Sequence, residues 1–129
     1  MQSINRVLVV SADVLLHNRL SNHLSSENYE IKVIKKANSE LEEIIGETSP
    51  HIIVVDPEIS QLNGVDISLR IRQVTPAPIL VLTTARTLDN QLRALDLAAE
   101  DYLSEPFDVN EVVERIEHIL SLNSPIVEY

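Results

Sequence analysis

The sequence predicts a single doubly wound α/β domain, (βα)5, in which a five-stranded parallel sheet carries helices on both faces. Two observations predict this fold: short β-branched runs alternate with stretches of helical spacing, and most of these runs are apolar on both faces. Alternating strands and helices form parallel sheets through right-handed crossovers. The 129 residues suit one domain. We assign residues 1–122 to it and residues 123–129 to a tail or the start of a linker.

The predicted strands are the β-branched runs at residues 6–10, 31–34, 52–55, 79–82 and, more weakly, 102–103. The first, third and fourth runs are apolar on both faces, as expected for strands that are buried in a parallel sheet. The second run alternates, because Glu30, Lys32 and Lys35 are interleaved with its apolar residues. This alternation indicates an edge strand.

Between the strands, apolar residues recur at helical spacing. They are Leu16, Leu20 and Leu24 in one stretch, Leu88, Leu92 and Leu95 in another, and Val109, Val112, Val113, Ile116 and Leu120 in the last. Asp108 stands at the N-cap of the last helix, and Glu111, three residues later, completes a capping-box pattern. Asn28 follows the first helix, where we expect a left-handed backbone conformation.

Composition excludes several classes of function. The formal net charge is −10, from 20 acidic and 10 basic residues, so we expect no direct binding of nucleic acid by this domain. The chain has no cysteine for a thiolate metal site, and its two glycines cannot build the loops that cradle nucleotide phosphates. We find no leader and no apolar run of membrane-spanning length, and therefore expect a cytoplasmic protein without membrane contact.

Polar residues follow the predicted strand ends, which in a parallel sheet meet at one crevice where ligands bind. Asp56 ends the third strand and Thr83 ends the fourth. The Asp56 carboxylate could act as a nucleophile, as a metal ligand or as the cap of the next turn, and the residues alone leave these alternatives open. No histidine pair combines ligand spacing with an acidic partner, so we expect solvated side chains at His17, His23, His51 and His118.

The spacing of these residues, with the text around them, resembles the receiver domains of two-component response regulators. The matching text is VLVV, IIVVD with Gly64 eight residues after Asp56, PILVLTTA, and AEDYLSEPF. The longer stretch AEDYLSEPFDVNEVVERI is most similar to receivers attached to winged-helix DNA-binding domains. The resemblance implies a flavodoxin-like receiver fold, a role in phosphorelay signal transduction and transcription regulation rather than enzymatic activity, and an effector domain beyond the linker.

The resemblance also implies roles for three residues of the crevice. These are the phosphoacceptor position at Asp56, the phosphoryl-contacting hydroxyl at Thr83 and the switch aromatic at Tyr102. In the family, a histidine kinase donates the phosphoryl group to the acceptor aspartate.

Three departures from the family remove the usual electrostatics of this site. Ser11 and Ala12 stand where the family has an acidic pair that helps hold Mg²⁺, and Glu105 stands where it has a lysine. Mg²⁺ favours carboxylate oxygens, and phosphoryl transfer relies on cations around the transferring oxygens. A like-charge pair about 4 Å apart costs on the order of 4 kcal/mol at an effective dielectric of about 20, which slows a reaction by orders of magnitude. We therefore predict an atypical receiver with impaired or absent phosphorylation of Asp56 and no resident cofactor.

Two alternatives stay open. Asp13 or Glu58 could supply a replacement ligand, so that Mg²⁺ binds weakly and Asp56 still accepts phosphate; the competing interpretation makes Asp13 the N-cap of the first helix. The second alternative is a cofactor-binding domain of flavodoxin-like fold. Against it, the sequence lacks the glycine loops for flavin or nucleotide and an Asp-x-His-x-x-Gly motif for cobalamin.

The resemblance further implies a homodimer through the fourth helix, fifth strand and fifth helix, held by charged pairs. The charges that match this face are Arg93, Asp96, Asp101, Glu111 and Arg115. Gln91 departs from the pattern, since a basic residue usually stands there. The competing interpretation is an ordinary solvated face, because exposed ion pairs contribute only about 0–1 kcal/mol each.

Overall fold

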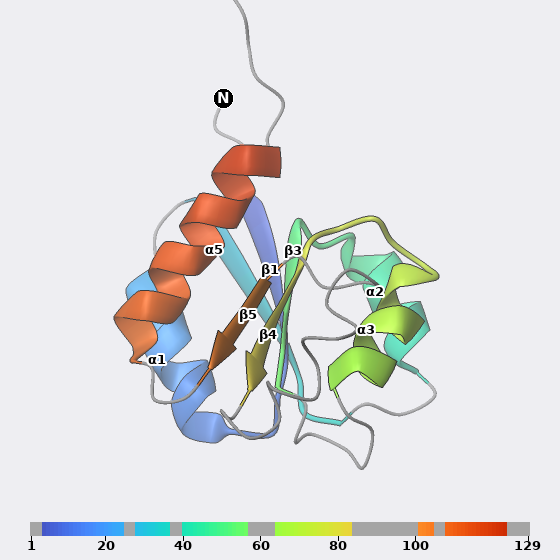
Figure 1. The fold of residues 1–129 in the computed structure, drawn as a ribbon, viewed down its shortest axis with the longest axis horizontal. Coiled ribbons are helices and arrows are strands. Elements are labelled where there is room, and N and C mark those ends of the chain that lie inside the picture. The colour runs from blue at the N-terminus through green and yellow to red at the C-terminus, as the bar shows by residue number, and fades with distance from the viewer. Residues whose placement is uncertain are drawn as a thin grey trace, which may run out of the picture.

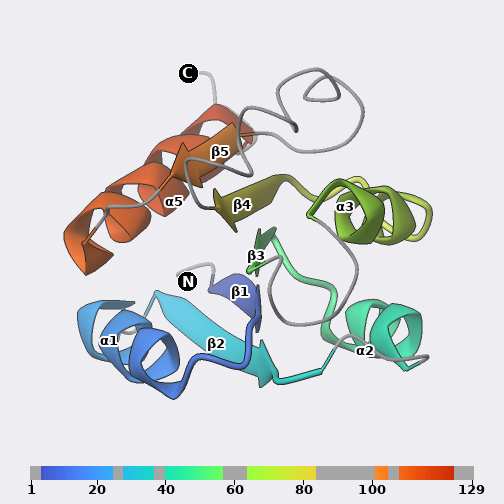
Figure 2. The ribbon, with the colours of Figure 1, turned by 60° about the horizontal axis from the view of Figure 1, so that its bottom comes forward.

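The computed structural model describes residues 4–24, 28–36, 40–56, 64–83, 101–104 and 108–123. They form a five-stranded parallel sheet in the order β2-β1-β3-β4-β5, shown in Figure 1. In chain order the elements are β1 (Asn5–Val10), α1 (Val14–Leu24), β2 (Tyr29–Ile34), α2 (Leu41–Thr48), β3 (Ile52–Val55), α3 (Gly64–Arg72), β4 (Ile79–Thr83), β5 (Asp101–Ser104) and α5 (Val109–Asn123). Helices α1 and α5 cover one face and α2 and α3 the other (Figure 2). The predicted fold class is confirmed.

All five predicted strands are present in the structure. The third has the predicted bounds, and the others extend by one or two residues. The alternating second run forms β2, which lies at an edge of the sheet as predicted. Among the helices, α5 continues to Asn123, one residue beyond the predicted domain boundary. The predicted helix around Leu88, Leu92 and Leu95 lies outside the described residues.

The sheet separates two apolar cores because successive side chains of a strand point to opposite faces. Val7 and Val9 of β1 belong to the core with α1 and α5, whereas Leu8 and Val10 belong to the core with α2 and α3. All four are at most 1% exposed. Full burial of such a side chain contributes about 1.5–3 kcal/mol, so helices are held against both faces of this interior strand.

The two helices on the first face differ in how well the sequence predicted them. In α5 the capping box is confirmed: Glu111 N donates to Asp108 Oδ1 at 2.9 Å, and Asp108 N donates to Glu111 Oε1 at 3.2 Å. In α1 the fully buried face carries His17 with Leu20 and Leu24, while Leu16 is only partly buried. The predicted stripe is therefore confirmed at Leu20 and Leu24, Leu16 packs against the same core, and His17 is an addition to this face.

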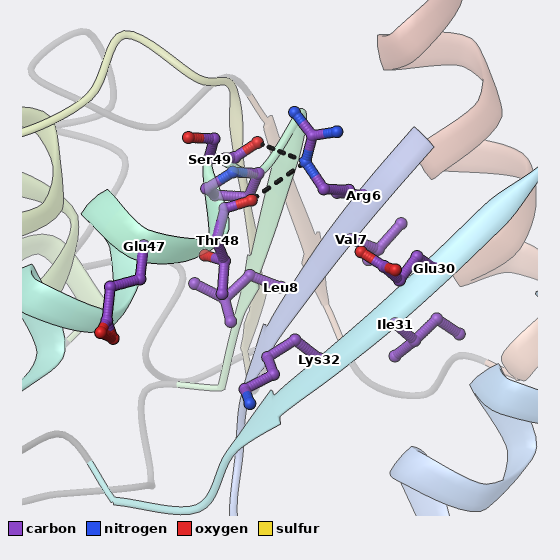
Figure 3. A pocket seen from close by; sticks show the side chains of 10 residues that line it. Arg6, Val7, Leu8, Glu30, Ile31, Lys32, Glu47, Thr48 and Ser49 are labelled. Carbon is purple, nitrogen blue, oxygen red and sulfur yellow. Dashed lines mark hydrogen bonds between the residues drawn. The ribbon is translucent and has the colours of Figure 1, made fainter. Parts of the chain in front are cut away.

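Among the described residues Ser49 has a left-handed backbone, whereas the expectation for Asn28 adjoins residues outside the described ranges and stays a prediction. Ser49 has φ 47° and caps the C-terminus of α2, its N–H donating to Ile45 O at 3.0 Å. Arg6 Nε donates to Thr48 O at 3.0 Å and to Ser49 O at 2.9 Å (Figure 3). A cation at a helix C-terminus compensates the partial negative charge of its unpaired carbonyls. Arg6 thus stabilises a turn that the local sequence did not predict.

No helix in the described part of the chain is long and apolar enough to cross a membrane.

Candidate functional site

The crevice begins where β1 and β3 end side by side. The last residues of these strands, Val10 and Val55, are register partners. Asp56 N donates to Val10 O at 2.9 Å, and Ser11 N donates to Ile34 O at 3.0 Å at the end of β2. The parallel sheet therefore places Ser11 and Asp56 next to one another, although 45 residues separate them in sequence.

These two side chains are bonded to each other. Ser11 Oγ donates to Asp56 Oδ2 at 3.0 Å, and the same oxygen accepts from Asp13 N at 3.0 Å. Ser11 is fully buried and Asp56 is half-buried. A serine hydroxyl has one proton to donate. Here Ser11 donates it in a hydrogen bond to Asp56, which the family resemblance predicts to be the phosphoacceptor position.

Asp13 is engaged by the helix that follows it. Its Oδ1 accepts from Leu15 N at 3.0 Å and from Leu16 N at 3.3 Å. These two hydrogen bonds satisfy amide groups that the first turn of α1 would otherwise leave unpaired. The interpretation of Asp13 as the N-cap of the first helix is confirmed.

The described side chains fit a magnesium site poorly. Ala12 is exposed and has no ligand atom, Ser11 offers a neutral oxygen that already bonds Asp56, and the Asp13 carboxylate caps α1. Mg²⁺ favours carboxylate oxygens in near-octahedral geometry. Within the described ranges, no group of three His, Cys, Asp or Glu side chains could hold a metal ion.

Several predicted site residues lie wholly or partly outside the described structure. Thr83 ends β4 opposite Ser104, and Tyr102 lies within β5 opposite Val81, so both backbones are at the predicted strand positions. The side chains of Thr83 and Tyr102 are not among those described. The other predicted residues outside the described ranges are Glu58, Arg93, Asp96 and Glu105.

The described charges of the predicted dimer face have partners within the chain. Arg115 Nη1, on α5, donates to Asp101 Oδ2 at the start of β5. Glu111 takes part in the capping box of α5. β5 and α5 therefore present an ion pair that forms without a second copy.

His17 is the residue of this region that the sequence did not reveal. It is 7% exposed, and its Nε2 lies 2.5 Å from Ser11 O. The expectation of a solvated side chain was wrong here. The available signal was its place three and seven residues before Leu20 and Leu24, the inward face of α1.

The other histidines lie at the surface. His23 Nδ1 is 2.9 Å from Arg19 O within its own helix, and His118 is exposed on α5. His51 is exposed yet bonded, since Arg6 N donates to its Nδ1 at 2.8 Å. Partial desolvation of the ring, and then the charge of Arg6, lower the pKa of His51.

The described structure also has a groove of about 610 Å³ between β2 and the C-terminal end of α2. It opens beside Arg6 and Lys32, with Glu30 and Glu47 also lining it (Figure 3). It reaches only to Leu8 on β1, whereas Ser11 and Asp56 follow the strand ends. The groove is therefore separate from the crevice.

Comparisons with known proteins agree with the fold. The family model of the response regulator receiver domain matches residues 7–117. The chain is 29% identical over 115 residues to response regulator ArlR of Staphylococcus saprophyticus, covering 89% of this chain and 52% of ArlR. It is 30% identical over 121 residues to response regulator MprA of a Mycobacterium species, covering 93% of this chain and 52% of MprA. The chain thus spans about half the length of these curated relatives.

Among solved structures, the receiver domain of the TMAO respiratory system response regulator TorR has the same fold. The two match with a TM-score of 0.80 at 22% identity, covering 93% of this chain and 99% of that one. At this identity the likeness establishes the fold alone. With the family model matching residues 7–117, the chain belongs to the response regulator receiver domains of two-component signalling.

Proposed function

We propose that this chain is an atypical receiver that acts as a regulatory and protein-interaction module, with Asp56 phosphorylated inefficiently or not at all. The hydrogen bond from Ser11 Oγ to Asp56 Oδ2 carries this proposal. A receiver that takes phosphate readily needs cations near its acceptor. Here a neutral hydroxyl occupies a position where the family has a carboxylate for Mg²⁺.

The electrostatics of the remaining positions support the proposal. Ala12 adds no ligand, and Asp13 is bound to the N-terminus of α1. Glu105 adds a negative charge where the family has a lysine. Each change removes stabilisation from the charge that develops on the transferring oxygens, and such stabilisation is the main contribution of protein to phosphoryl transfer.

The module would regulate a longer protein. Because the chain spans about half of ArlR and MprA, we propose that residues 1–122 are the receiver and that the tail leads to a DNA-binding effector domain of the winged-helix kind. Its output would pass through dimerisation or partner binding, with a signal other than efficient phosphorylation setting its state. A histidine kinase as phosphate donor belongs to the competing model of a slow but functional acceptor.

The test compares this chain with a variant whose site is restored. Wild type, the triple variant Ser11→Asp/Ala12→Asp/Glu105→Lys, and Asp56→Asn in the triple background are incubated with acetyl phosphate and Mg²⁺, and intact mass is measured. We expect the triple variant to gain one phosphoryl group that the Asp56→Asn control lacks, while wild type gains little, because only the restored site supplies the metal and the lysine.

Wild-type protein that is labelled at Asp56 as fast as the triple variant, with Mg²⁺ required, would contradict the proposal. Beryllofluoride with Mg²⁺ gives an independent readout, since spectral changes at Asp56 of the wild type would favour the functional acceptor.

A further inference from the structure

We propose that His17 is a positioning residue for Asp56. Its imidazole fixes the Ser11 peptide, so that the Ser11 hydroxyl stays hydrogen-bonded to the carboxylate of Asp56. The inference rests on the proposed function in treating Asp56 as the acceptor position. It adds to that function by naming the group that holds the carboxylate in place of a cation.

The first step is the contact between α1 and the loop before it. His17 Nε2 lies 2.5 Å from Ser11 O, and His17 is 7% exposed. A carbonyl oxygen only accepts, so Nε2 bears the proton and donates it. Leu20 and Leu24 are buried on the same face of α1, and their packing fixes the rotation of the helix that brings the imidazole to this carbonyl.

The second step is that Ser11 is bonded at every polar atom. Its N–H donates to Ile34 O at 3.0 Å, its carbonyl accepts from His17, and its Oγ accepts from Asp13 N at 3.0 Å. The remaining hydroxyl proton points to Asp56 Oδ2 at 3.0 Å. Because Ser11 is fully buried, rotation of its side chain would leave polar groups unpaired away from water, which is costly.

The third step is what loss of the imidazole would do. The buried Ser11 carbonyl would lose its donor, and buried carbonyls are nearly always paired. The peptide would move towards water to recover a hydrogen bond, and the hydroxyl that the same residue carries would move with it. His17 thus acts on Asp56 through Ser11 rather than by contact.

The experiment observes the Asp56 side-chain carboxyl in unphosphorylated, metal-free protein labelled with carbon-13 at aspartate. The variants are His17→Leu, Ser11→Ala, the two together, His17→Gln, and His23→Leu as control. His23→Leu removes an exposed imidazole of the same helix, whose Nδ1 lies 2.9 Å from Arg19 O. Glutamine can place its amide N–H near the position of the histidine Nε2 and so restore the donor.

We expect His17→Leu to move the Asp56 carboxyl resonance in the same direction as Ser11→Ala and by at least half as much. His17→Gln should return it towards wild type, and His23→Leu should leave it in place. In the Ser11→Ala background, His17→Leu should add no further shift, because its effect passes through the hydroxyl that is already gone.

The inference is overturned if His17→Leu leaves the resonance in place while Ser11→Ala moves it, or if its shift is equally large in the Ser11→Ala background. Should His17→Leu fail to fold, the pair His17→Gln and His17→Asn decides. The shorter asparagine cannot reach the Ser11 carbonyl, so only it should shift the resonance, and equal positions for the two variants refute the role. This experiment does not measure phosphoryl uptake. A negative result would therefore refute the role of His17 without refuting the proposed function.

Discussion

Ser11 Oγ lies 3.0 Å from Asp56 Oδ2 at a position where receiver domains have a carboxylate. Two carboxylates at this distance would repel each other and would need a cation between them. A hydroxyl instead donates a charge-assisted hydrogen bond, which is about twice as strong as a neutral one. At this position, therefore, Asp56 Oδ2 accepts a hydrogen bond from a neutral side chain.

At the same scale, His51 gives the fold a dependence on pH. Arg6 N donates to His51 Nδ1 at 2.8 Å, which requires that this nitrogen be unprotonated. Because the folded-state pKa lies below the ordinary 6.5, the unfolded chain binds the proton more readily. The stabilisation is fully present above the unfolded pKa and is lost as the pH falls through the lowered folded value.

We predict that the free energy of unfolding in urea decreases as the pH is lowered from about 7.5 to about 5, and that protonation of His51 accounts for part of this decrease. In His51→Asn the amide oxygen takes the place of Nδ1 as acceptor and does not titrate, so this variant should lose the part of the slope that His51 contributes. Identical pH profiles for wild type and His51→Asn would show that His51 does not contribute.

Between elements, Glu42 of α2 and Arg70 of α3 form a two-point ion pair. Arg70 Nε donates to Glu42 Oε2 at 2.5 Å, and Arg70 Nη2 donates to Glu42 Oε1 at 2.9 Å. The hydrogen bond from Arg70 lowers the pKa of Glu42. The pair lies on the surface, with side-chain exposures of 25% for Arg70 and 35% for Glu42, so water and salt screen it.

We predict a coupling free energy of about 0.5–1 kcal/mol between Glu42→Gln and Arg70→Met in a double-mutant cycle of urea unfolding. It should shrink in about 1 M NaCl, where charges are screened within about 3 Å. It is present above the unfolded pKa of Glu42, 4.5, and lost as the pH falls through the lowered folded value. Glu43→Gln, an exposed change of equal charge on α2, is the control; an equal coupling of Glu43 with Arg70 would refute the specific pair.

The helices show which parts of an element can be predicted locally. The capping box of α5 involves Asp108 and Glu111, three residues apart, so the sequence contains all of it. The rotation of α1 depends on the surface against which the helix packs. Leucine spacing predicted that Leu16, Leu20 and Leu24 face the core, and all three pack there. It did not predict that His17 is also buried, because the Ser11 carbonyl that its imidazole meets lies outside the helix.

For the whole molecule, dimerisation through β5 and α5 is a proposal. The described charged residues of this face already have partners within the chain. Arg115 and Asp101 form one ion pair between α5 and β5. We predict that wild type sediments as a dimer at high protein concentration. The swapped variant Asp101→Arg/Arg115→Asp should sediment as a monomer, because it keeps the internal pair but reverses the charges offered to a second copy.

Sedimentation equilibrium gives the mass, and an unchanged dimer mass in the swapped variant would exclude this face as the interface. A monomeric wild type at every concentration would contradict the proposal directly.

The sequence by itself determined the five strands, their parallel direction in one sheet and the edge of the sheet at which Asp56 and Thr83 follow the strands. Hydrophobic periodicity is a local property, and two rules, that crossovers are right-handed and that parallel strands end at the same edge, convert it into topology. Through the resemblance to receiver domains, the identities of Ser11, Ala12 and Glu105 also predict an atypical crevice, and this stays a prediction.

Only the tertiary structure decided which polar groups bond across that fold. The contacts Ser11–Asp56, Arg6–Ser49 and Arg70–Glu42 join residues 45, 43 and 28 positions apart. Whether such groups meet depends on strand register, helix rotation and side-chain direction to within about 0.5 Å, the tolerance of a hydrogen bond. Periodicity does not contain that information, because many rotations of a helix bury the same apolar face.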